Sequence, residues 1–548
     1  MMPFVRTSRA QRANAVATAI VVGLLLLVMS GCGIPKLGLA KHGPPLPGDF
    51  NGATTSDNTS YVGTSEFFND PRLTGLINQA LWGNQQLRIL SPDIAIANNE
   101  VLKRRGSFLP FVTFGGGASL ENLSTYTPLG ADLSQIVSPT GQPFPNPLPD
   151  FLIGADITWQ VDIWRQLRNA RDSAGLRYLG TVDGWNYVVT RLVAEISENY
   201  YKLMALDKQL ETLDRTIALQ EQSLEIAKSQ KEGARGTELA VQRFQAEVRK
   251  NQSDKLIIYQ QIIETENRVN FLAGRYPQAV ERDSNGFIDL NLYTLSVGVP
   301  SQLLLNRPDI RQAERDLQAA GLDVRVARAN FYPRLTITSG VGYEAFNAKY
   351  LFFTPESLIY GVAGGLVAPL INKRAIQADY LTANAKQLQA IYEYQRVTLN
   401  AFTEVVNRVS KVQNYSRSIE LKKQQLDSLE SAVDVASKLF QNARVEYMDV
   451  LFAQRDRNDA RLVLIDTKRE QLSAIVNAYQ ALGGGWRNVG GPAPPPQWIP
   501  QTSIQLPVNP PVNLPPVGPP AEEVPTPQPP VILPAPEIQP APVIQPAP

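Results

Sequence analysis

The only cysteine of the chain, Cys32, directly follows the small residues Ser30 and Gly31. This pattern resembles a lipobox, in which a signal peptidase cleaves before the cysteine and the thiol then carries a diacylglycerol. The preceding residues fit a signal peptide, because a basic start is followed by a short apolar stretch at 15–29. We therefore predict a cleaved signal over 1–31 and a lipid anchor at Cys32 that includes palmitate. An ordinary secretory signal with an incidental cysteine is the alternative.

The other residue types that usually carry catalysis or metal binding are almost absent. The only histidine, His42, lies in a Gly/Pro-rich stretch. One Cys and one His cannot build the usual zinc site, and the sequence has no nucleophile elbow, phosphate-binding loop or mid-chain His base. With 52 basic and 51 acidic residues, it also lacks the basic excess of a nucleic-acid-binding protein. We predict no enzyme activity, no cofactor, no metal and no nucleic-acid partner.

Alternation of apolar and polar residues marks the predicted strands. It is clearest from Ile153 to Ile163, where apolar residues take the odd positions and polar or small residues the even ones. A run of this length and period is typical of a tilted transmembrane strand, whereas a soluble sandwich would show more short strands. The predicted lipid-facing residues are Ile153, Ile157, Trp159 and Val161. The predicted strands cover about 111–122, 151–163, 334–345 and 357–370.

Two long intervals without proline, 164–231 and 372–441, predict very long helices. Apolar residues such as Val189, Leu192 and Ile196 recur at spacings of three and four, which favours coiled-coil packing. At 1.5 Å per residue each helix would measure roughly 100 Å, so it needs partners alongside. Shorter helices that return along them are predicted at 237–272 and 447–482.

The sequence repeats itself. Phe108-Leu-Pro110 matches Phe331-Tyr-Pro333, and Leu272-Ala-Gly274 matches Leu482-Gly-Gly484. A period of about 210 residues is too long for a solenoid, so each half should be a complete structural unit. We predict a linker at 32–65, repeats at 66–277 and 278–486, and a Pro-rich tail at 487–548.

The predicted strands imply an oligomer. Four strands cannot close a barrel, and lipid does not tolerate an open sheet edge. Three copies would supply twelve strands, enough for a channel. The residues themselves therefore predict an α+β membrane protein with an internal duplication that assembles as a homo-oligomer.

After Trp486 the composition changes, because 22 of the 42 prolines fall in the remaining residues. Such a segment favours polyproline II and cannot bury a core. It is interpreted as a solvated, disordered tail or as a docking strip for a periplasmic or cell-wall partner.

Several ordered motifs resemble the TolC family, and in particular the NodT-like outer-membrane factor lipoproteins of multidrug (RND-type) efflux systems. The resemblance spans about residues 66–487. The motifs are Val299–Ile310 with its Arg307-Pro308-Asp309, Trp159–Trp164, Met448–Arg455 and Tyr479–Trp486.

The resemblance implies a homotrimeric outer-membrane channel, lipid-anchored and extending into the periplasm, in which a 12-stranded transmembrane barrel is continuous with a helical coiled-coil tunnel. It would be the passive exit duct for small molecules or drugs, opened by a periplasmic adaptor (membrane fusion protein) and an inner-membrane pump. The alternatives are the channel of a type I protein-secretion system and a coiled-coil lipoprotein scaffold without a pore.

By the same resemblance, the turns between the long helices dock the adaptor. The candidate residues are Gly233, Arg235, Gly236, Thr237 and Leu239 at the first turn and Ala443, Arg444 and Val445 at the second. The glycines suit a tight turn, and Thr237 suits a helix N-cap. Glu446 and Asp449 are gate candidates; the alternative is that they are solvated residues at a helix start. Pro92 is expected to interrupt the first short helix.

Overall fold

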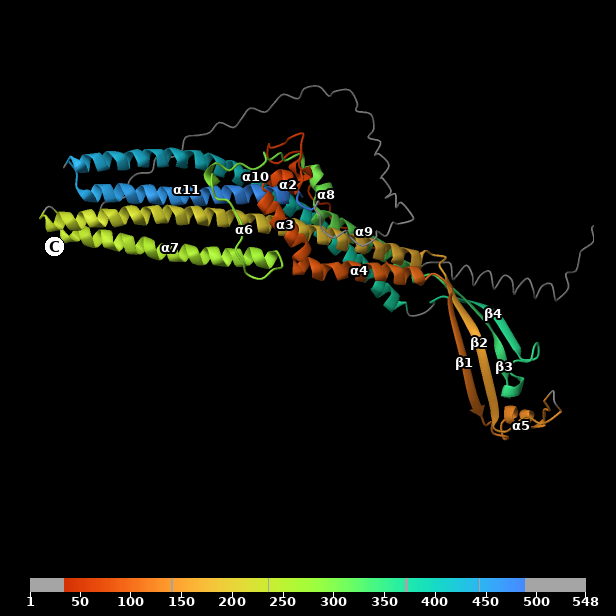
Figure 1. Ribbon diagram of the computed structural model, residues 1–548. Helices are drawn as coiled ribbons and strands as arrows, with labels where there is room; N and C mark the ends of the chain where they lie inside the picture. Colours follow the sequence, from red (N-terminus) through yellow and green to blue (C-terminus); the bar gives the residue numbers. More distant parts are fainter. Residues whose placement is uncertain (1–33, 139–140, 235, 370–372, 443, 488–548) are drawn as a thin grey trace, which may run out of the picture. The chain divides into compact units, whose positions relative to one another are not determined.

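A computed structural model of the protein describes residues 34–138, 141–234, 236–369, 373–442 and 444–487 (Figure 1). The predicted signal peptide, Cys32 and nearly all of the Pro-rich tail lie outside these residues. So do Arg235 and Ala443 of the predicted docking turns. The described elements belong to one compact unit of the chain.

Four antiparallel strands form one sheet in the order β1-β2-β3-β4. The strand β2 (Leu148–Val161) begins before the predicted start at 151 and ends before the predicted end at 163. It ends early because the Asp162 carboxylate turns the chain and accepts hydrogen bonds from the backbone N–H groups of Leu167 and Arg168, both at 3.0 Å. The strands are β1 (Phe111–Glu121), β2 (Leu148–Val161), β3 (Arg334–Ala345) and β4 (Leu358–Val367).

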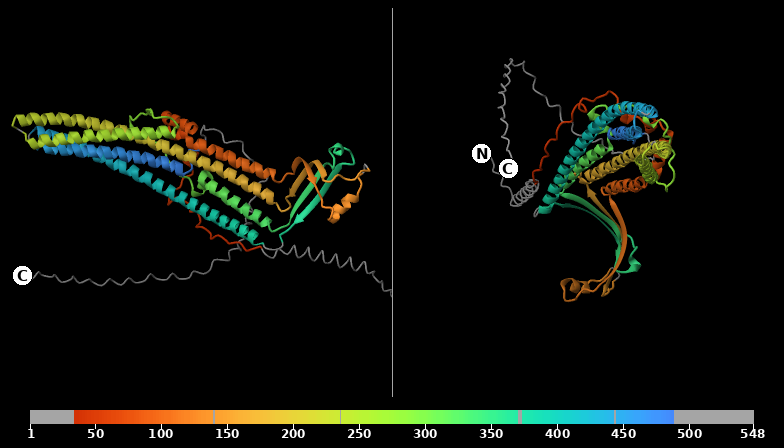
Figure 2. Two further views of the ribbon diagram at one scale, coloured as in Figure 1. Left: turned by 90° about the horizontal axis from the view of Figure 1, so that it is seen from below. Right: turned by 90° about the vertical axis from the view of Figure 1, so that its left-hand side faces the viewer.

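Two helical hairpins carry most of the chain, and their four helices run side by side (Figures 1 and 2). They are α6 (Gln166–Glu232) with α7 (Glu238–Leu272), and α10 (Arg374–Gln441) with α11 (Tyr447–Ala481). The shorter helices are α2 (Thr64–Phe68), α3 (Pro71–Gly83), α4 (Gln85–Gly106), α5 (Pro128–Gln135), α8 (Leu303–Asn306) and α9 (Pro308–Ala329). Short 3-10 turns lie at Thr59–Tyr61, Phe287–Asp289, Pro300–Gln302 and Ala348–Tyr350.

The lengths of equivalent elements reveal the internal duplication. α4 and α9, which precede the first strand of each half, each have 22 residues. α6 and α10 have 67 and 68 residues, and α7 and α11 each have 35. Each half therefore runs helix, two strands, long helix and returning helix.

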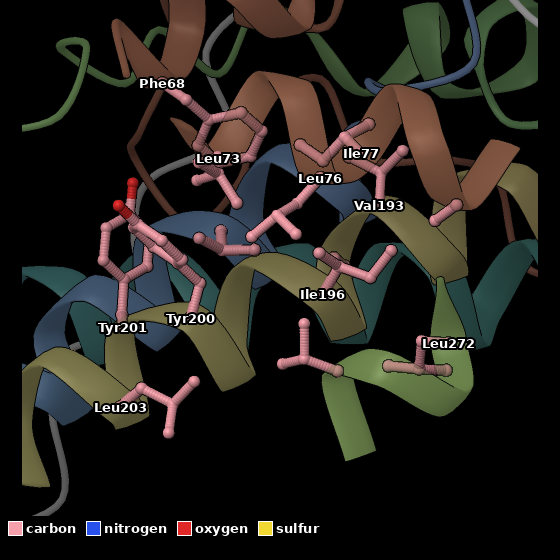
Figure 3. Packing of buried hydrophobic residues seen from close by; sticks show 14 of the residues in the cluster. Phe68, Leu73, Leu76, Ile77, Val193, Ile196, Tyr200, Tyr201, Leu203 and Leu272 are labelled. Atoms are coloured by element: carbon pink, nitrogen blue, oxygen red, sulfur yellow. The ribbon is translucent and has the colours of Figure 1, made fainter. Parts of the chain in front are cut away.

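The main core surrounds the middle of α6 (Figure 3). Val193 and Ile196 of α6 lie on the side that faces Leu73 and Ile77 of α3, Leu203 belongs to the same cluster, and all five are almost fully buried. The apolar spacing seen in the sequence therefore corresponds to a seam inside the protomer. Among the described residues, no helix combines the length and apolar character needed to cross a membrane.

The expectation that Pro92 interrupts the first short helix is wrong. α4 continues through Pro92, and the Asn84 side chain caps its start by accepting a hydrogen bond from the Leu87 N–H at 3.1 Å. Buried Ile94 and Val101 pack against α6 in a cluster that includes Tyr178. This packing offsets the hydrogen bond that proline cannot donate inside a helix.

Candidate functional site

The two faces of the sheet differ in chemistry. Directly opposed residues of neighbouring strands share a face, so the register assigns every strand residue to one face or the other. The four predicted lipid-facing residues share one face, here called the apolar face. Its large side chains are Val112, Phe114, Leu120, Phe151, Ile153, Ile157, Trp159, Val161, Leu335, Ile337, Val341, Tyr343, Leu358, Tyr360, Val362 and Leu366.

The opposite face, here called the polar face, consists mainly of glycine, threonine and charged residues, with a few apolar residues such as Leu152 and Ile359. All the charged residues of the four strands lie on it, and none lies on the apolar face. They are Glu121, Asp150, Asp156, Arg334 and Glu344. On the apolar face, Phe114 is 76% and Val362 79% exposed. Such a wide exposed apolar surface indicates contact with a partner or a membrane.

Aromatic residues gather at both ends of the sheet. At the helix end, the Trp159 indole donates to the Phe108 carbonyl at 3.1 Å, and Trp164 stacks on Tyr332 with ring centroids 4.8 Å apart. At the other end, Tyr343 packs on Phe352 at 5.8 Å. Further ring pairs there are Phe144 with Phe346, Phe346 with Tyr350, and Tyr350 with Phe353. Two aromatic girdles flanking an apolar band are typical of sheets in an outer membrane.

Both outer edges of the sheet lack a partner strand among the described residues, since β1 and β4 each pair with one neighbour only. Each edge therefore presents a row of backbone N–H and C=O groups. Such edges favour pairing with another chain, and they are costly in a lipid environment.

The turn between α6 and α7 is here called the first tip. Its shape depends on its backbone conformation and on one helix N-cap. Thr237 caps α7, because its hydroxyl oxygen accepts a hydrogen bond from the Ala240 N–H at 3.3 Å. Gly236 suits its place, since an added Cβ would lie 3.1 Å from the Lys231 nitrogen. The left-handed position is Ala234 (φ 56°), whereas Gly233 has a negative φ of −76°. Of the predicted docking residues, Leu239 is 62% exposed.

The turn between α10 and α11, here called the second tip, has a different cap. The Asn442 side chain donates to the Lys438 carbonyl at 2.8 Å at the end of α10. Glu446 precedes α11 but makes no side-chain cap. Glu446, Asp449 and Arg444 are all exposed, while Val445 is half-buried. Neither gate candidate forms an ion pair with a described residue, and their role as a gate stays a prediction.

An aromatic contact that the sequence did not suggest joins the two tips. The Tyr447 ring packs on Phe244 of α7 and on Phe440 of α10, with centroids 4.7 Å apart in both cases. Phe244 is fully buried, together with Ala227. Burial raises the pKa of Tyr447. The two hairpins are thus tied beside their turns, through residues whose only sequence signal was their aromatic type.

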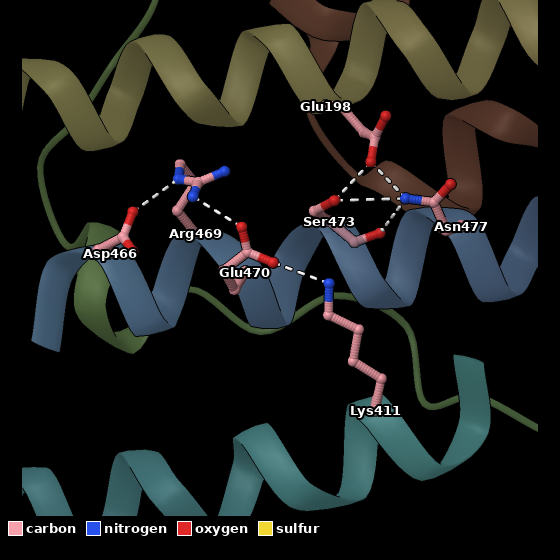
Figure 4. A network of polar contacts seen from close by, with 7 residues as sticks. All are labelled: Glu198, Lys411, Asp466, Arg469, Glu470, Ser473 and Asn477. Atoms are coloured by element: carbon pink, nitrogen blue, oxygen red, sulfur yellow. Dashed lines mark hydrogen bonds and ion pairs between the residues drawn. The ribbon is translucent and has the colours of Figure 1, made fainter. Parts of the chain in front are cut away.

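Further from the tips, polar side chains connect the long helices (Figure 4). The Glu198 carboxylate of α6 accepts hydrogen bonds from Ser473 and Asn477 of α11. Lys411 of α10 pairs with Glu470 of α11 at 2.8 Å, and this contact lowers the pKa of Glu470. Such contacts add polar links between α11 and both long helices to the apolar packing of Leu472 and Val476 in the main core.

The Arg307 guanidinium is a buried junction between α9, α10 and α11. It is 4% exposed and pairs with Asp309 at 2.7 Å and with Glu404 of α10 at 2.9 Å. It also donates to the Ala481 carbonyl at 2.8 Å, at the end of α11. The Trp486 indole donates to the Asn306 carbonyl at 3.1 Å. Two sequence motifs far apart in the chain therefore meet here.

The N-terminal segment at 34–50, here called the strap, runs along α10. Ile34 packs in a cluster with Phe331 and Tyr380, close to the start of β3. Further along, the Gln395 side chain donates to the Lys41 carbonyl at 3.2 Å. Phe50 then stacks on Phe402 with centroids 5.5 Å apart. The strap therefore begins at the sheet end of α10 and follows this helix toward the middle of its length.

Comparisons with known proteins agree with this architecture. The model of the outer membrane efflux protein family matches residues 76–275 and 299–484. The cation efflux system protein CusC of Escherichia coli O6:H1 is 26% identical over 84% of this chain and 97% of its own length. The solvent efflux pump outer membrane protein SrpC of Pseudomonas putida is 26% identical over 78% of this chain and 88% of its own.

Solved structures share the fold. A crystal structure of CusC covers 82% of this chain and 100% of its own, with 25% identity and a TM-score of 0.71. The open state of the MtrE outer membrane channel of Neisseria gonorrhoeae covers 83% of this chain and 98% of its own, with 20% identity and a TM-score of 0.72.

Proposed function

Because the chain belongs to the outer membrane efflux protein family and is an outer-membrane efflux channel component, we propose that three copies of it form one exit duct. The three four-stranded sheets would close a twelve-stranded barrel, with the apolar face toward lipid and the polar face toward the lumen. The long helices would continue the duct as a tunnel into the periplasm. Transport through it is passive, with no catalytic step.

The distribution of side chains over the sheet is the observation that carries this proposal. An apolar face without any charge, bounded at both ends by aromatic residues, fits a hydrocarbon layer between two interfaces. The open edges at β1 and β4 fit strand pairing with neighbouring copies, because only closure satisfies the backbone groups of a sheet in lipid.

A stripe of exposed apolar residues on α10 supports the oligomer. At 100° per residue, its five members fall within about 40° of one another on the helix surface. Leu399 is 58% and Leu421 66% exposed, so the described residues leave most of both side chains uncovered. A second copy is the occupant that a symmetric assembly would supply. The stripe consists of Leu381, Tyr392, Leu399, Leu421 and Val435.

The course of the strap supports a lipid anchor at Cys32. Ile34 lies beside Phe331, just before β3 enters the sheet. Since each residue spans at most about 3.6 Å, a lipid on Cys32 would attach within about 7 Å of Ile34. This is the end of the helices that adjoins the sheet, where a membrane anchor belongs.

The two tips are the proposed docking and gating elements. Both lie at the opposite end of the long helices from the sheet (Figure 1). Exposed Leu239, Thr237 and Arg444 offer contacts to a periplasmic adaptor, which would couple the duct to an inner-membrane pump. Three copies of Glu446 or Asp449 around a narrow pore would repel one another and attract cations. The proposed cargo is small molecules, in line with the cations and solvents for which two relatives are named.

Conductance in planar bilayers tests the duct. We expect purified full-length protein to insert and give discrete current steps. As a matched variant, Phe114→Asp places a charge on the apolar face, where burial in lipid costs several kcal/mol, and should abolish insertion. Thr113→Asp adds the same charge to the neighbouring position on the polar face and should leave membrane insertion intact. Absence of conductance in the wild type, or equal behaviour of the two variants, would overturn the proposal.

A further inference from the structure

A hollow of about 530 Å³ lies on the polar face and crosses all four strands. Glycines form most of its floor on this face, at Gly115, Gly117, Gly154, Gly340, Gly342 and Gly361. At Gly154 and Gly342, which oppose each other on β2 and β3, the backbone leaves no space for a side chain. An added Cβ on Gly154 would lie 2.9 Å from the Val341 carbonyl oxygen, and one on Gly342 would lie 2.6 Å from that of Ile153. The glycines therefore keep this part of the face open.

Asp156 is the one acidic or basic residue that lines the hollow. Its directly opposed neighbours are Thr113 on β1 and Gly340 on β3. The carboxylate forms no ion pair with a described residue, and its side chain is exposed. The field of an exposed carboxylate without an ion-pair partner acts on ions that pass the hollow.

The other charged residues of the polar face lie nearer the strand ends. Glu121 ends β1, Asp150 lies near the start of β2, and Glu344 precedes the last residue of β3. These three share the end of the sheet remote from the helices, whereas Arg334 begins β3 at the helix end. Along the middle of the sheet, Asp156 stands alone among glycine, threonine and apolar neighbours.

We propose that Asp156, set in the glycine-lined hollow, makes the barrel section of the duct selective for cations over anions. The inference rests on the proposed function, because it needs the polar face to line a water-filled lumen. Symmetry would then place three carboxylates at one level of the barrel, where a ring of like charge attracts cations and repels anions. Since the groups are exposed to water, the effect weakens as salt shortens the Debye length to about 10 Å at 0.1 M.

The reversal potential in a KCl gradient tests this inference. We expect wild-type channels to prefer K⁺ over Cl⁻, and Asp156→Asn to lower that permeability ratio by about two- to fivefold. Asp150→Asn removes the same charge from the same strand and face, near the end of the sheet, and should change the ratio less. A wild type without cation preference, or equal effects of the two variants, would overturn the role of Asp156.

A thiol variant keeps the test valid if Asp156→Asn assembles poorly. In Asp156→Cys, the only other cysteine is Cys32. Labelling the assembled channel with a methanethiosulfonate that carries a sulfonate should restore cation preference, and one that carries an ammonium should reverse it. No change with either label would also contradict the proposal. If wild-type protein does not conduct at all, the proposed duct fails first, which distinguishes that outcome from the failure of the Asp156 inference.

Discussion

α6 and α10 are equivalent helices of the two repeats and are nearly equal in length, but their surroundings differ. In α6, 28 of 67 residues are buried, because α3, α4, α7, α9 and α11 pack around it. α10 contacts mainly α9 and α11. Its buried described residues are Tyr380, Asn384, Ala401, Val405, Val409, Ile419 and Val433. The protomer thus surrounds the first long helix on more sides than the second, and the exposed part of α10 is where the proposed assembly would place a neighbouring copy.

The largest expected effect is a loss of stability on substitution in α6, the more buried of the two long helices. Leu203 of α6 is fully buried, so Leu203→Ala should lower the free energy of unfolding by about 2–5 kcal/mol through the cavity it leaves. Gln222→Ala, at an exposed position of the same helix, should change it by less than about 0.5 kcal/mol. Denaturant unfolding followed by helical circular dichroism measures both. Equal losses would show that α6 is not the centre of the core.

The second hairpin contains a buried lysine that should make its stability depend on pH. Lys468 of α11 is 3% exposed and donates a hydrogen bond to the Gln471 side chain at 2.9 Å. Burial lowers its pKa to about 8; Lys423 also lowers it, whereas Asp289 and Glu420 act in the opposite sense.

Whether stability rises or falls with pH follows from the number of protons that the folded and the unfolded state bind. Below pH 8 both folded and unfolded states hold the proton, and the burial penalty is complete. Between about pH 8 and the ordinary value of about 10.4 the unfolded state binds more protons, so stability should rise with pH. We expect a gain of about 2 kcal/mol at pH 9.5 relative to pH 7.5, taken as the difference between wild type and Lys468→Met. The same pH profile in both proteins would refute the assignment.

A charge on the exposed stripe of α10 should break the assembly. Leu399→Glu would bury a carboxylate between copies, and a penalty of only 1.4 kcal/mol already lowers the ratio of oligomer to monomer about tenfold. Asn400→Glu adds the same charge one residue further, about 100° away on the helix, and should leave the ratio nearly unchanged. Size-exclusion chromatography with light scattering in detergent measures the ratio. If both variants disassemble, or neither does, the interface between copies does not lie at the stripe.

The smallest expected effect is a difference in helix capping between the first tip and the second tip. Thr237 caps α7, whereas Glu446 makes no cap for α11. Thr237→Ala should therefore destabilise the first turn of α7 by about 1 kcal/mol, which is about fivefold faster amide exchange at 238–241. Glu446→Ala should leave exchange at the start of α11 almost unaltered. Hydrogen exchange with mass spectrometry resolves both segments. Similar changes in exchange at the two tips would contradict the predicted difference in capping between the repeats.

Elements with a regular environment could be predicted from the sequence. The alternation at 153–163 located β2 because one whole face of the sheet is apolar. The Pro-free intervals located α6 and α10 because each continues undisturbed for its whole length. The contacts that organise the tips and the body could not be predicted. Tyr447 meets Phe244, and Glu198 meets Ser473, only because the hairpins lie side by side.

Local exceptions also needed the structure. Pro92 stays inside α4 because tertiary packing outweighs its missing hydrogen bond, and Ala234 takes the left-handed position at the first tip although Gly233 precedes it. Asp156 was visible in the sequence only as one polar residue of an alternating strand. Its significance depends on glycines from other strands that the register brings beside it.

The number of chains in the native complex tests the central claim most directly. If the protomer leaves α10 and two sheet edges to be covered by identical neighbours, native mass spectrometry of protein released from detergent micelles should give a single species of three copies. A monomer or a dimer as the dominant species would contradict the account, because neither can close the sheet.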